Sequence, residues 1–263
     1  MPTGSVNGIA LRYKIGGPSD KEVLAMLHGW TASHQLFEFG GFFEALSKQL
    51  HVVSFDQRGH GDSEKPEEGY GLEQFTADVK GLLDHLGIRR KVIVLGQSMG
   101  GYIAAGFVLR YPEAAKGLIL MNTTLHLLDG EDSRQAWQAV IEAQKVDREG
   151  TMRNLVGQMF RKQPKPELVD RQIEMTMKTP LPIAIRVFEG VLAGDVLKDG
   201  HKITIPTLII HGEHDIIPLH HAEAAHRAIP GSRLVVMKDC GHLPSLEMPE
   251  ETQRLILEFA ASL

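Results

Sequence analysis

The chain has 263 residues, which places it between one and two domains of a typical size of about 150 residues. The composition is 43% apolar and 23% charged, which excludes a disordered or repetitive chain and predicts a globular fold with a sizeable core. A net charge of −5 removes the electrostatic reason to expect a nucleic acid or an anionic membrane surface as a partner.

The cysteine content and the apolar runs indicate a compartment. A single cysteine, Cys240, allows no disulfide within the chain, so nothing in the sequence requires an oxidising environment. The first residues lack a basic and apolar leader pattern, and the longest apolar run, near residues 102–109, is far shorter than the roughly 18 residues of a membrane span. We therefore expect a cytoplasmic protein that does not associate with membranes.

Short apolar runs alternate with amphipathic stretches, a pattern typical of a mostly parallel sheet with helices on both faces. The predicted strands cover residues 6–15, 23–27, 51–55, 91–95, 118–121, 207–210 and 234–237. Several of them are almost continuously apolar, as buried parallel strands are. Helical spacing predicts helices over residues 75–86, 102–111 and 252–259. The fold class is therefore α/β.

The alternating pattern stops between about residues 124 and 201, where the sequence is helix-like and carries four prolines and four of the ten methionines. We interpret this segment as a helical cap inserted after the sixth proposed strand. The α/β core is then formed by residues 1–123 and 202–263. The apolar side chains of the insertion either pack it onto the core or line a substrate pocket, and both roles can apply to different residues. The candidate pocket residues here are Trp137, Met159 and Phe160.

The main chemical signature is Gly96-Gln97-Ser98-Met99-Gly100-Gly101, which joins a predicted strand directly to a predicted helix. Glycines two residues before and two after the serine let the strand and the helix approach closely, so a strained turn pushes the hydroxyl out at the carboxyl end of the sheet. The amino terminus of the helix points N–H groups at a developing negative charge. Ser98 is therefore the predicted nucleophile, and its neighbour Gln97 is a candidate substrate contact.

A serine nucleophile needs a base, and the base needs an acid that fixes its tautomer. One late strand leads into a turn that holds Asp215, and the next leads into a loop that holds His242. We expect Ser98, Asp215 and His242 to meet at one edge of the sheet, in the chain order nucleophile, acid, base. Glu213 is the competing acid, whereas Asp239 lies too close in sequence to His242 to orient it easily.

An acyl-transfer site also needs donors for an oxyanion. The backbone N–H of Met99 is one candidate, and that of Trp30, in the turn after residues 23–27, is the other. The indole of Trp30 would form a wall of the pocket, with plain core packing as the alternative. His28 fits a residue that braces this loop better than a catalytic one.

The 13 histidines raise the question of a metal site. Their spacing matches none of the usual zinc motifs. The late group overlaps the proposed acid turn and a helix expected to begin near Leu219; it comprises His211, His214, His220, His221 and His226. We interpret most of these as surface or supporting residues and Cys240 as a small loop residue. We expect neither a metal nor another cofactor.

Five segments, in this order and spanning essentially the whole chain, resemble the signature segments of the α/β-hydrolase superfamily. They are His28-Gly29-Trp30, residues 56–63 (Asp-Gln-Arg-Gly-His-Gly-Asp-Ser), residues 96–101, Gly212-Glu213-His214-Asp215 and Gly241-His242. The resemblance implies an α/β-hydrolase fold with Ser98, Asp215 and His242 as triad, Trp30 and Met99 as oxyanion donors, and residues 124–201 as a lid. It implies a structural turn for residues 56–63.

A serine at position 98 argues against the haloalkane dehalogenases and epoxide hydrolases of this superfamily, which use an aspartate. The segments 28–31 and 241–247 look most like those of small bacterial carboxylesterases and 3-oxoadipate enol-lactonases. We therefore expect a serine hydrolase that cleaves a small carboxylic ester or lactone through an acyl-enzyme. This small molecule is the expected partner, and the sequence predicts no oligomeric state.

Three alternatives stay open. Meta-cleavage-product C–C hydrolases usually carry a glycine-rich loop and an asparagine before the serine, from which Trp30-Thr31-Ala32 and Gln97 depart. A menaquinone-pathway lyase of the same fold would need cations for its substrate, and solvated helix faces explain the candidate cations equally well: Arg153, Arg161, Arg171 and Arg186. The third alternative, of another class, is a small-molecule receptor with little turnover.

Overall fold

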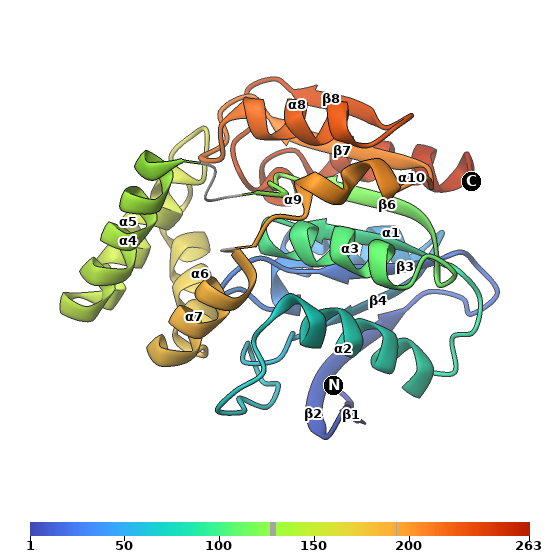
Figure 1. The fold of residues 1–263 in the computed structure, drawn as a ribbon, viewed down its shortest axis with the longest axis horizontal. Helices are drawn as coiled ribbons and strands as arrows, with labels where there is room; N and C mark the ends of the chain where they lie inside the picture. The colour runs from blue at the N-terminus through green and yellow to red at the C-terminus, as the bar shows by residue number, and fades with distance from the viewer. Residues whose placement is uncertain (127–129, 193) are drawn as a thin grey trace.

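The computed structural model describes residues 1–126, 130–192 and 194–263 (Figure 1). Its centre is an eight-stranded sheet in the order β1-β2-β4-β3-β5-β6-β7-β8. The first two strands, β1 (Thr3–Val6) and β2 (Ile9–Gly16), are antiparallel to their neighbours, and all other pairs are parallel. The parallel strands are β3 (Val23–Leu27), β4 (His51–Phe55), β5 (Val92–Gln97), β6 (Ala115–Met121), β7 (Thr207–Gly212) and β8 (Arg233–Met237). The predicted α/β fold with a mostly parallel sheet is confirmed.

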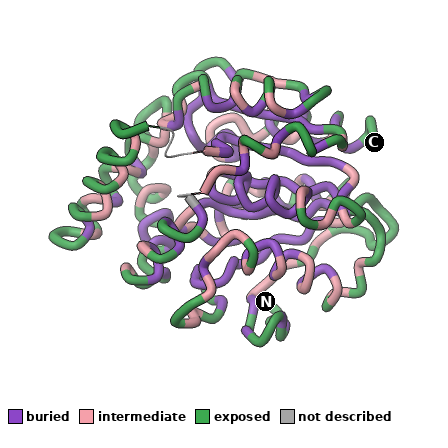
Figure 2. Tube along the Cα trace, in the orientation of Figure 1, coloured by how far each residue is buried: buried purple, intermediate pink, exposed green. Residues whose placement is uncertain are grey.

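Helices cover both faces of the sheet because successive strand residues point to opposite sides. In β3, for example, Val23, Ala25 and Leu27 belong to one buried cluster, whereas Leu24 and Met26 belong to the other. The first cluster is covered by α2 (Leu72–His85), α3 (Met99–Arg110) and α8 (Leu219–Ala228), and the second by α1 (Phe42–Ser47) and α10 (Pro249–Ala261). The central strands of the sheet are therefore buried between two helical layers, as the burial map also shows (Figure 2).

The first predicted strand is wrong in one respect: residues 6–15 form parts of two strands. Asn7 and Gly8 both have positive φ, 49° and 80°, and they join β1 to β2 with Val6 opposite Ile9. An Asn-Gly pair in a two-residue hairpin turn adopts this conformation at little cost. The sheet consequently has eight strands where the sequence predicts seven.

The segment between β6 and β7 is helical and lies at one end of the sheet (Figure 1). It follows the sixth strand of the structure, which is the fifth of the predicted runs. Its helices are α4 (Glu131–Val146), α5 (Arg148–Gln158), α6 (Pro166–Met177) and α7 (Leu181–Val187), then a π-turn (Phe188–Leu192) and a 3₁₀ turn (Leu197–Lys202). We call residues 124–201 the cap segment; these exact boundaries stay a prediction.

The cap segment has a small apolar cluster of its own, in which Met152 and Val156 of α5 meet Ile173 of α6. By contrast, Ile183 and Val187 of α7 join the main core beside α3. Helices α5 and α6 therefore pack around an apolar cluster of their own, whereas α7 is part of the main core. No helix among the described residues is both long and apolar enough to cross a membrane.

Candidate active site

Ser98 stands between β5 and α3 in a strained conformation, with φ 54° and ψ −124°. Such a backbone costs energy and persists only where the surroundings enforce it. A Cβ added to Gly96 would lie 2.0 Å from the oxygen of Gly100, and one added to Gly100 would lie 2.1 Å from the oxygen of Leu27. The glycines are therefore required for the close contact of strand and helix that sets up this turn.

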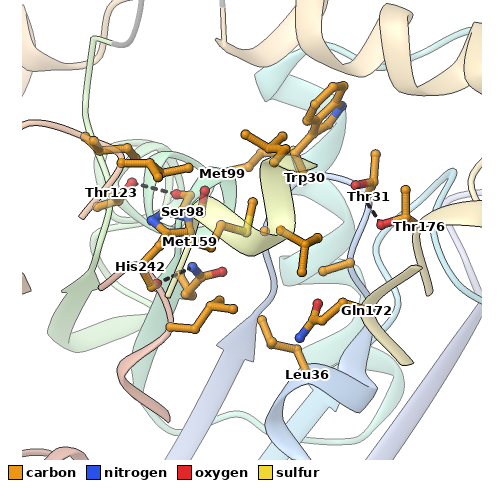
Figure 3. A pocket seen from close by; sticks show the side chains of 18 of the residues that line it. Trp30, Thr31, Leu36, Ser98, Met99, Thr123, Met159, Gln172, Thr176 and His242 are labelled. Atoms are coloured by element: carbon orange, nitrogen blue, oxygen red, sulfur yellow. Dashed lines mark hydrogen bonds between the residues drawn. The ribbon is translucent and has the colours of Figure 1, made fainter. Parts of the chain in front are cut away.

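Ser98 and His242 line one pocket, which encloses about 780 Å³ including its open mouth (Figure 3). The core contributes the turn after β3, the serine turn, the end of β6 and the loops after β7 and β8. Helices α4, α5 and α6 of the cap segment contribute the remaining wall. The pocket therefore lies between the carboxyl edge of the sheet and the cap segment.

His242 is hydrogen-bonded to Asp215, with 2.6 Å between Nδ1 and Oδ1. Burial acts to raise the pKa of Asp215, but the charge of His242 and the hydrogen bond to it outweigh burial, so this pKa lies below its usual value. The same carboxylate oxygen accepts a bond from the backbone N–H of Ile217 at 2.9 Å. Glu213, the competing acid, is half-exposed and accepts a bond from the N–H of Asp239 instead. The structure thus places Asp215, and not Glu213, beside His242.

Asn122 is a functional residue that sequence reasoning missed. It directly follows β6, is fully buried and has a positive φ of 46°. Its Nδ2 donates to Oδ2 of Asp215 at 2.7 Å and to the carbonyl of Gly241 at 2.8 Å. Asn122 therefore ties the acid to the histidine loop. Its place at the carboxyl end of a parallel strand is the signal that could have identified it, because the same argument located Asp215.

The histidine loop is also bonded to the cap segment. The N–H of His242 donates to the carbonyl of Met159 at 2.6 Å. Glu247, at the end of the short helix α9 (Pro244–Glu247), accepts bonds from the N–H of Gly241 at 2.9 Å and of Arg161 at 2.7 Å. Burial of Glu247 raises its pKa, although these bonds act in the opposite direction. One carboxylate of the core thus holds both the histidine loop and the cap segment.

Both predicted oxyanion donors, Trp30 and Met99, line the pocket. Neither backbone N–H donates a hydrogen bond to any other described residue, so both are available to a ligand. The indole of Trp30 donates to the carbonyl of Ala184 in α7 at 2.9 Å and packs edge-on against Trp137. The side chain of Trp30 thereby fixes the loop against the cap segment, and its backbone N–H stays free.

Below this loop, His28 is fully buried and acts as a brace. Its Nδ1 donates to the carbonyl of Gly29, and its Nε2 accepts the N–H of Gln57 at 3.0 Å. Burial lowers the pKa of His28 to about 4, so the ring is neutral at pH 7. In residues 56–63, the carboxylate of Asp56 accepts bonds from the N–H groups of His34 and Asp62. None of these eight residues lines the pocket.

Of the candidate substrate contacts, Gln97, Trp137 and Met159 line the pocket. Phe160 is not among the lining residues; its ring packs against the apolar cluster between α5 and α6. The prediction relied on helical spacing, but α5 ends at Gln158, so that spacing does not extend to Phe160. The polar lining that sequence reasoning missed consists of Thr31, Thr123, Thr124, Gln172 and Thr176.

The arrangement of the histidines and the cysteine can be compared with that of a metal site in the part of the chain that the structure describes. Within it, no group of three or more His, Cys, Asp or Glu side chains is arranged to hold a metal ion. The Nε2 of His211 bonds to the carbonyl of Ile217 at 3.0 Å. Burial raises the pKa of Cys240 to about 12, which keeps the thiol protonated.

Comparison with known proteins identifies the family. Residues 18–248 match the family described as "Serine aminopeptidase, S33". The AB hydrolase superfamily protein YisY of Bacillus subtilis is 30% identical over 91% of each chain. Among solved structures, an esterase from Exiguobacterium antarcticum has a TM-score of 0.91 at 25% identity and covers 98% of both chains.

The enol-lactonase from Burkholderia xenovorans has the same fold, with a TM-score of 0.89 at 24% identity, covering 99% of this chain and 100% of that one. The family match, the full-length relatives and the eight-stranded sheet agree with the resemblance that the sequence motifs indicate. The chain belongs to the α/β-hydrolase superfamily, within the family described as "Serine aminopeptidase, S33".

Proposed function

We propose that this α/β-hydrolase is a serine hydrolase that cleaves a small carboxylic ester or lactone through an acyl-enzyme. The observation that carries the proposal is the 2.6 Å bond between His242 and the buried Asp215, with His242 lining the same pocket as Ser98. The relative from Exiguobacterium antarcticum is described as an esterase, which supports ester cleavage.

In the proposed reaction, Nε2 of His242 takes the proton of Ser98 while Oγ attacks the substrate carbonyl. The bond of Nδ1 to Asp215 fixes the tautomer in which Nε2 can act as base, and the ionised Asp215 stabilises the imidazolium that forms. The N–H groups of Trp30 and Met99 bind the oxyanion. His242 then gives its proton to the leaving alcohol, and water, activated by the same histidine, releases the acid and restores Ser98.

The lining of the pocket favours a neutral ester over two other substrates. Among the described lining residues there is no carboxylate to bind the free amino group of a peptide, and no Lys or Arg to bind a multiply charged lyase substrate. Two of the four arginines considered for the lyase are engaged elsewhere. Arg153 pairs with Glu149 and Asp170, and Arg171 stacks over the ring of Phe39.

The test is Ser98→Ala, assayed with p-nitrophenyl acetate, p-nitrophenyl butyrate and a simple lactone. We expect kcat to fall by at least about a thousandfold, because removing the nucleophile disables the triad as a unit. The circular dichroism spectrum and Tm should match those of the wild type. Ser19→Ala, at an exposed loop serine, is the matched control and should keep full activity. Full turnover in Ser98→Ala would overturn the proposal.

A further inference from the structure

The wall of the pocket opposite Ser98 and His242 carries polar side chains from α6 (Figure 3). Gln172 and Thr176 are one helical turn apart, and Thr176 lies 3.5 Å from Thr31, measured between the two Oγ1 atoms. Gln172 is only 7% exposed. Its Nε2 is buried and has no hydrogen-bond partner among the described residues. Gln172 thus brings to the pocket wall an amide whose nitrogen the described residues do not satisfy.

An unsatisfied buried amide is costly, because the group has lost its bonds to water and gained none in return. Such groups are rare in folded proteins, and each one calls for an explanation. No described residue bonds to this nitrogen, and much of the pocket lining is apolar, including Leu36, Met152, Leu155, Val156 and Met159. Rotation about the soft terminal amide torsion turns Nε2 towards the pocket, where an oxygen atom of a bound ligand would satisfy it.

The remaining lining restricts the charge of that ligand. No Asp, Glu, Lys or Arg lines the pocket within the described residues, and His242 is the titratable side chain there. A carboxylate or ammonium group carried into the pocket would lose its hydration without gaining a counter-charge. The oxygen that meets Gln172 therefore belongs to a neutral group.

We infer that Gln172 is a specificity-determining residue that binds a second, uncharged oxygen of the substrate, remote from the bond that is cleaved. The substrate class is then a neutral ester or lactone with an additional ketone, hydroxyl or ether oxygen, whose carbon chain contacts the apolar side chains of α5. This inference rests on the proposed function, since it assumes that the carbonyl to be attacked lies at Ser98.

The experiment compares pairs of p-nitrophenyl esters of equal chain length, in which one methylene of the acyl chain is replaced by an ether oxygen at successive positions. A second series places the oxygen in the alcohol arm of butyrate esters. We expect kcat/KM to favour the oxygenated member by roughly tenfold at one position, which corresponds to the net contribution of one neutral hydrogen bond. Esters whose acyl chain ends in a carboxylate should be poorer by a similar factor.

Gln172→Leu and Gln172→Met should bring the ratio within each pair close to one, whatever the absolute activity of the variant. Two variants are used so that a folding defect in one does not decide the outcome. Gln158→Leu changes an exposed glutamine of α5 and should keep the wild-type ratios.

Ser98-dependent turnover without any preference for an oxygenated ester, or a preference that survives in both Gln172 variants, would overturn the inference and leave the proposed function intact. The absence of Ser98-dependent turnover for every ester in both series would overturn the proposed function, and the inference with it.

Discussion

At the scale of single residues, Asn122 connects the two loops that carry the acid and the base. Its amide reaches both Asp215 and the carbonyl of Gly241, and its positive φ aims the side chain between them. Asparagine tolerates this left-handed conformation better than most residues. We regard Asn122 as a positioning residue, because it acts through Asp215 and His242 and is not part of the pocket lining.

Asn122→Ala should lower kcat about tenfold or more with little change in KM, since a hydrogen bond to a charged group typically contributes about 1.5–3 kcal/mol. Asn122→Asp should shift the acid limb of the pH–rate profile to higher pH, because a second negative charge beside Asp215 stabilises the protonated imidazolium of His242, which cannot act as base. Kinetics between pH 5 and 9 measure both effects. Asn154→Ala, at an exposed position of α5, is the control. An unchanged kcat and pH profile in both Asn122 variants would contradict the assignment.

Residues inside local motifs could be identified from the sequence, and isolated ones could not. Glycines lie two residues on either side of Ser98 and directly before His242; these glycines mark sharp turns, so both segments could be recognised. Asn122 and Gln172 carry no such mark; their importance depends on partners 93 residues away or on a cavity that exists only after the cap segment has packed. Tertiary contacts decide such roles.

At the scale of elements, the short helix α9 links the core to the cap segment. One turn of helix brings the carboxylate of Glu247 back over the start of its own loop, where it accepts the N–H groups of Gly241 and Leu243. Its other oxygen accepts the N–H of Arg161, just beyond α5. The position of the cap segment over the pocket is therefore coupled to the loop that holds His242.

Glu247→Gln replaces one acceptor oxygen by an NH₂ group, so at least one backbone N–H loses its partner in either orientation of the amide. The free energy of unfolding should fall by about 1–3 kcal/mol, the cost of an unsatisfied buried donor. We expect kcat/KM to fall about tenfold as well, because the histidine loop loses its support. Urea titration and steady-state kinetics measure the two effects, with Glu250→Gln, at an exposed site of α10, as control. Wild-type values for both in Glu247→Gln would rule out this coupling.

The elements themselves were predictable to different degrees. Apart from the partly exposed edge strand β8, the parallel strands are buried on both faces and read as nearly continuous apolar runs, so β3 and β4 were predicted with their observed bounds. The hairpin of β1 and β2 was missed although Asn7-Gly8 is the usual signal for its turn, because β1 is short and Val6 was counted with the alternation that begins only at Ile9. In the cap segment, the spacing indicated helices but not which face turns to the pocket, since α5 and α6 use apolar residues for their own cluster as well.

At the scale of the whole molecule, buried histidines make the free energy of unfolding depend on pH. His28 and His60 are fully buried with their rings 5.2 Å apart. Burial lowers the pKa of His28 to about 4 and that of His60 to about 3. Burial also lowers the pKa of His211. The rings of His28 and His60 are therefore neutral in the folded protein throughout the mildly acidic range, whereas in the unfolded chain they take up protons below pH 6.5.

Because the unfolded state binds more protons, the free energy of unfolding should fall as the pH falls from 6.5 towards the folded pKa values. Each such histidine contributes a slope approaching about 1.4 kcal/mol per pH unit in this window. The lowered pKa of Asp215 changes the free energy of unfolding in the same direction, but only below its unfolded value of 3.8, so it has no effect between pH 6 and 5.

Urea titrations at pH 7, 6 and 5 measure the slope of the free energy of unfolding against pH. His60→Asn should reduce it by about one histidine's share, and His201→Asn, at an exposed position, should not change it. A wild-type slope below about 1 kcal/mol per pH unit, or the same slope in wild type and His60→Asn, would show that these rings are protonated in the folded protein.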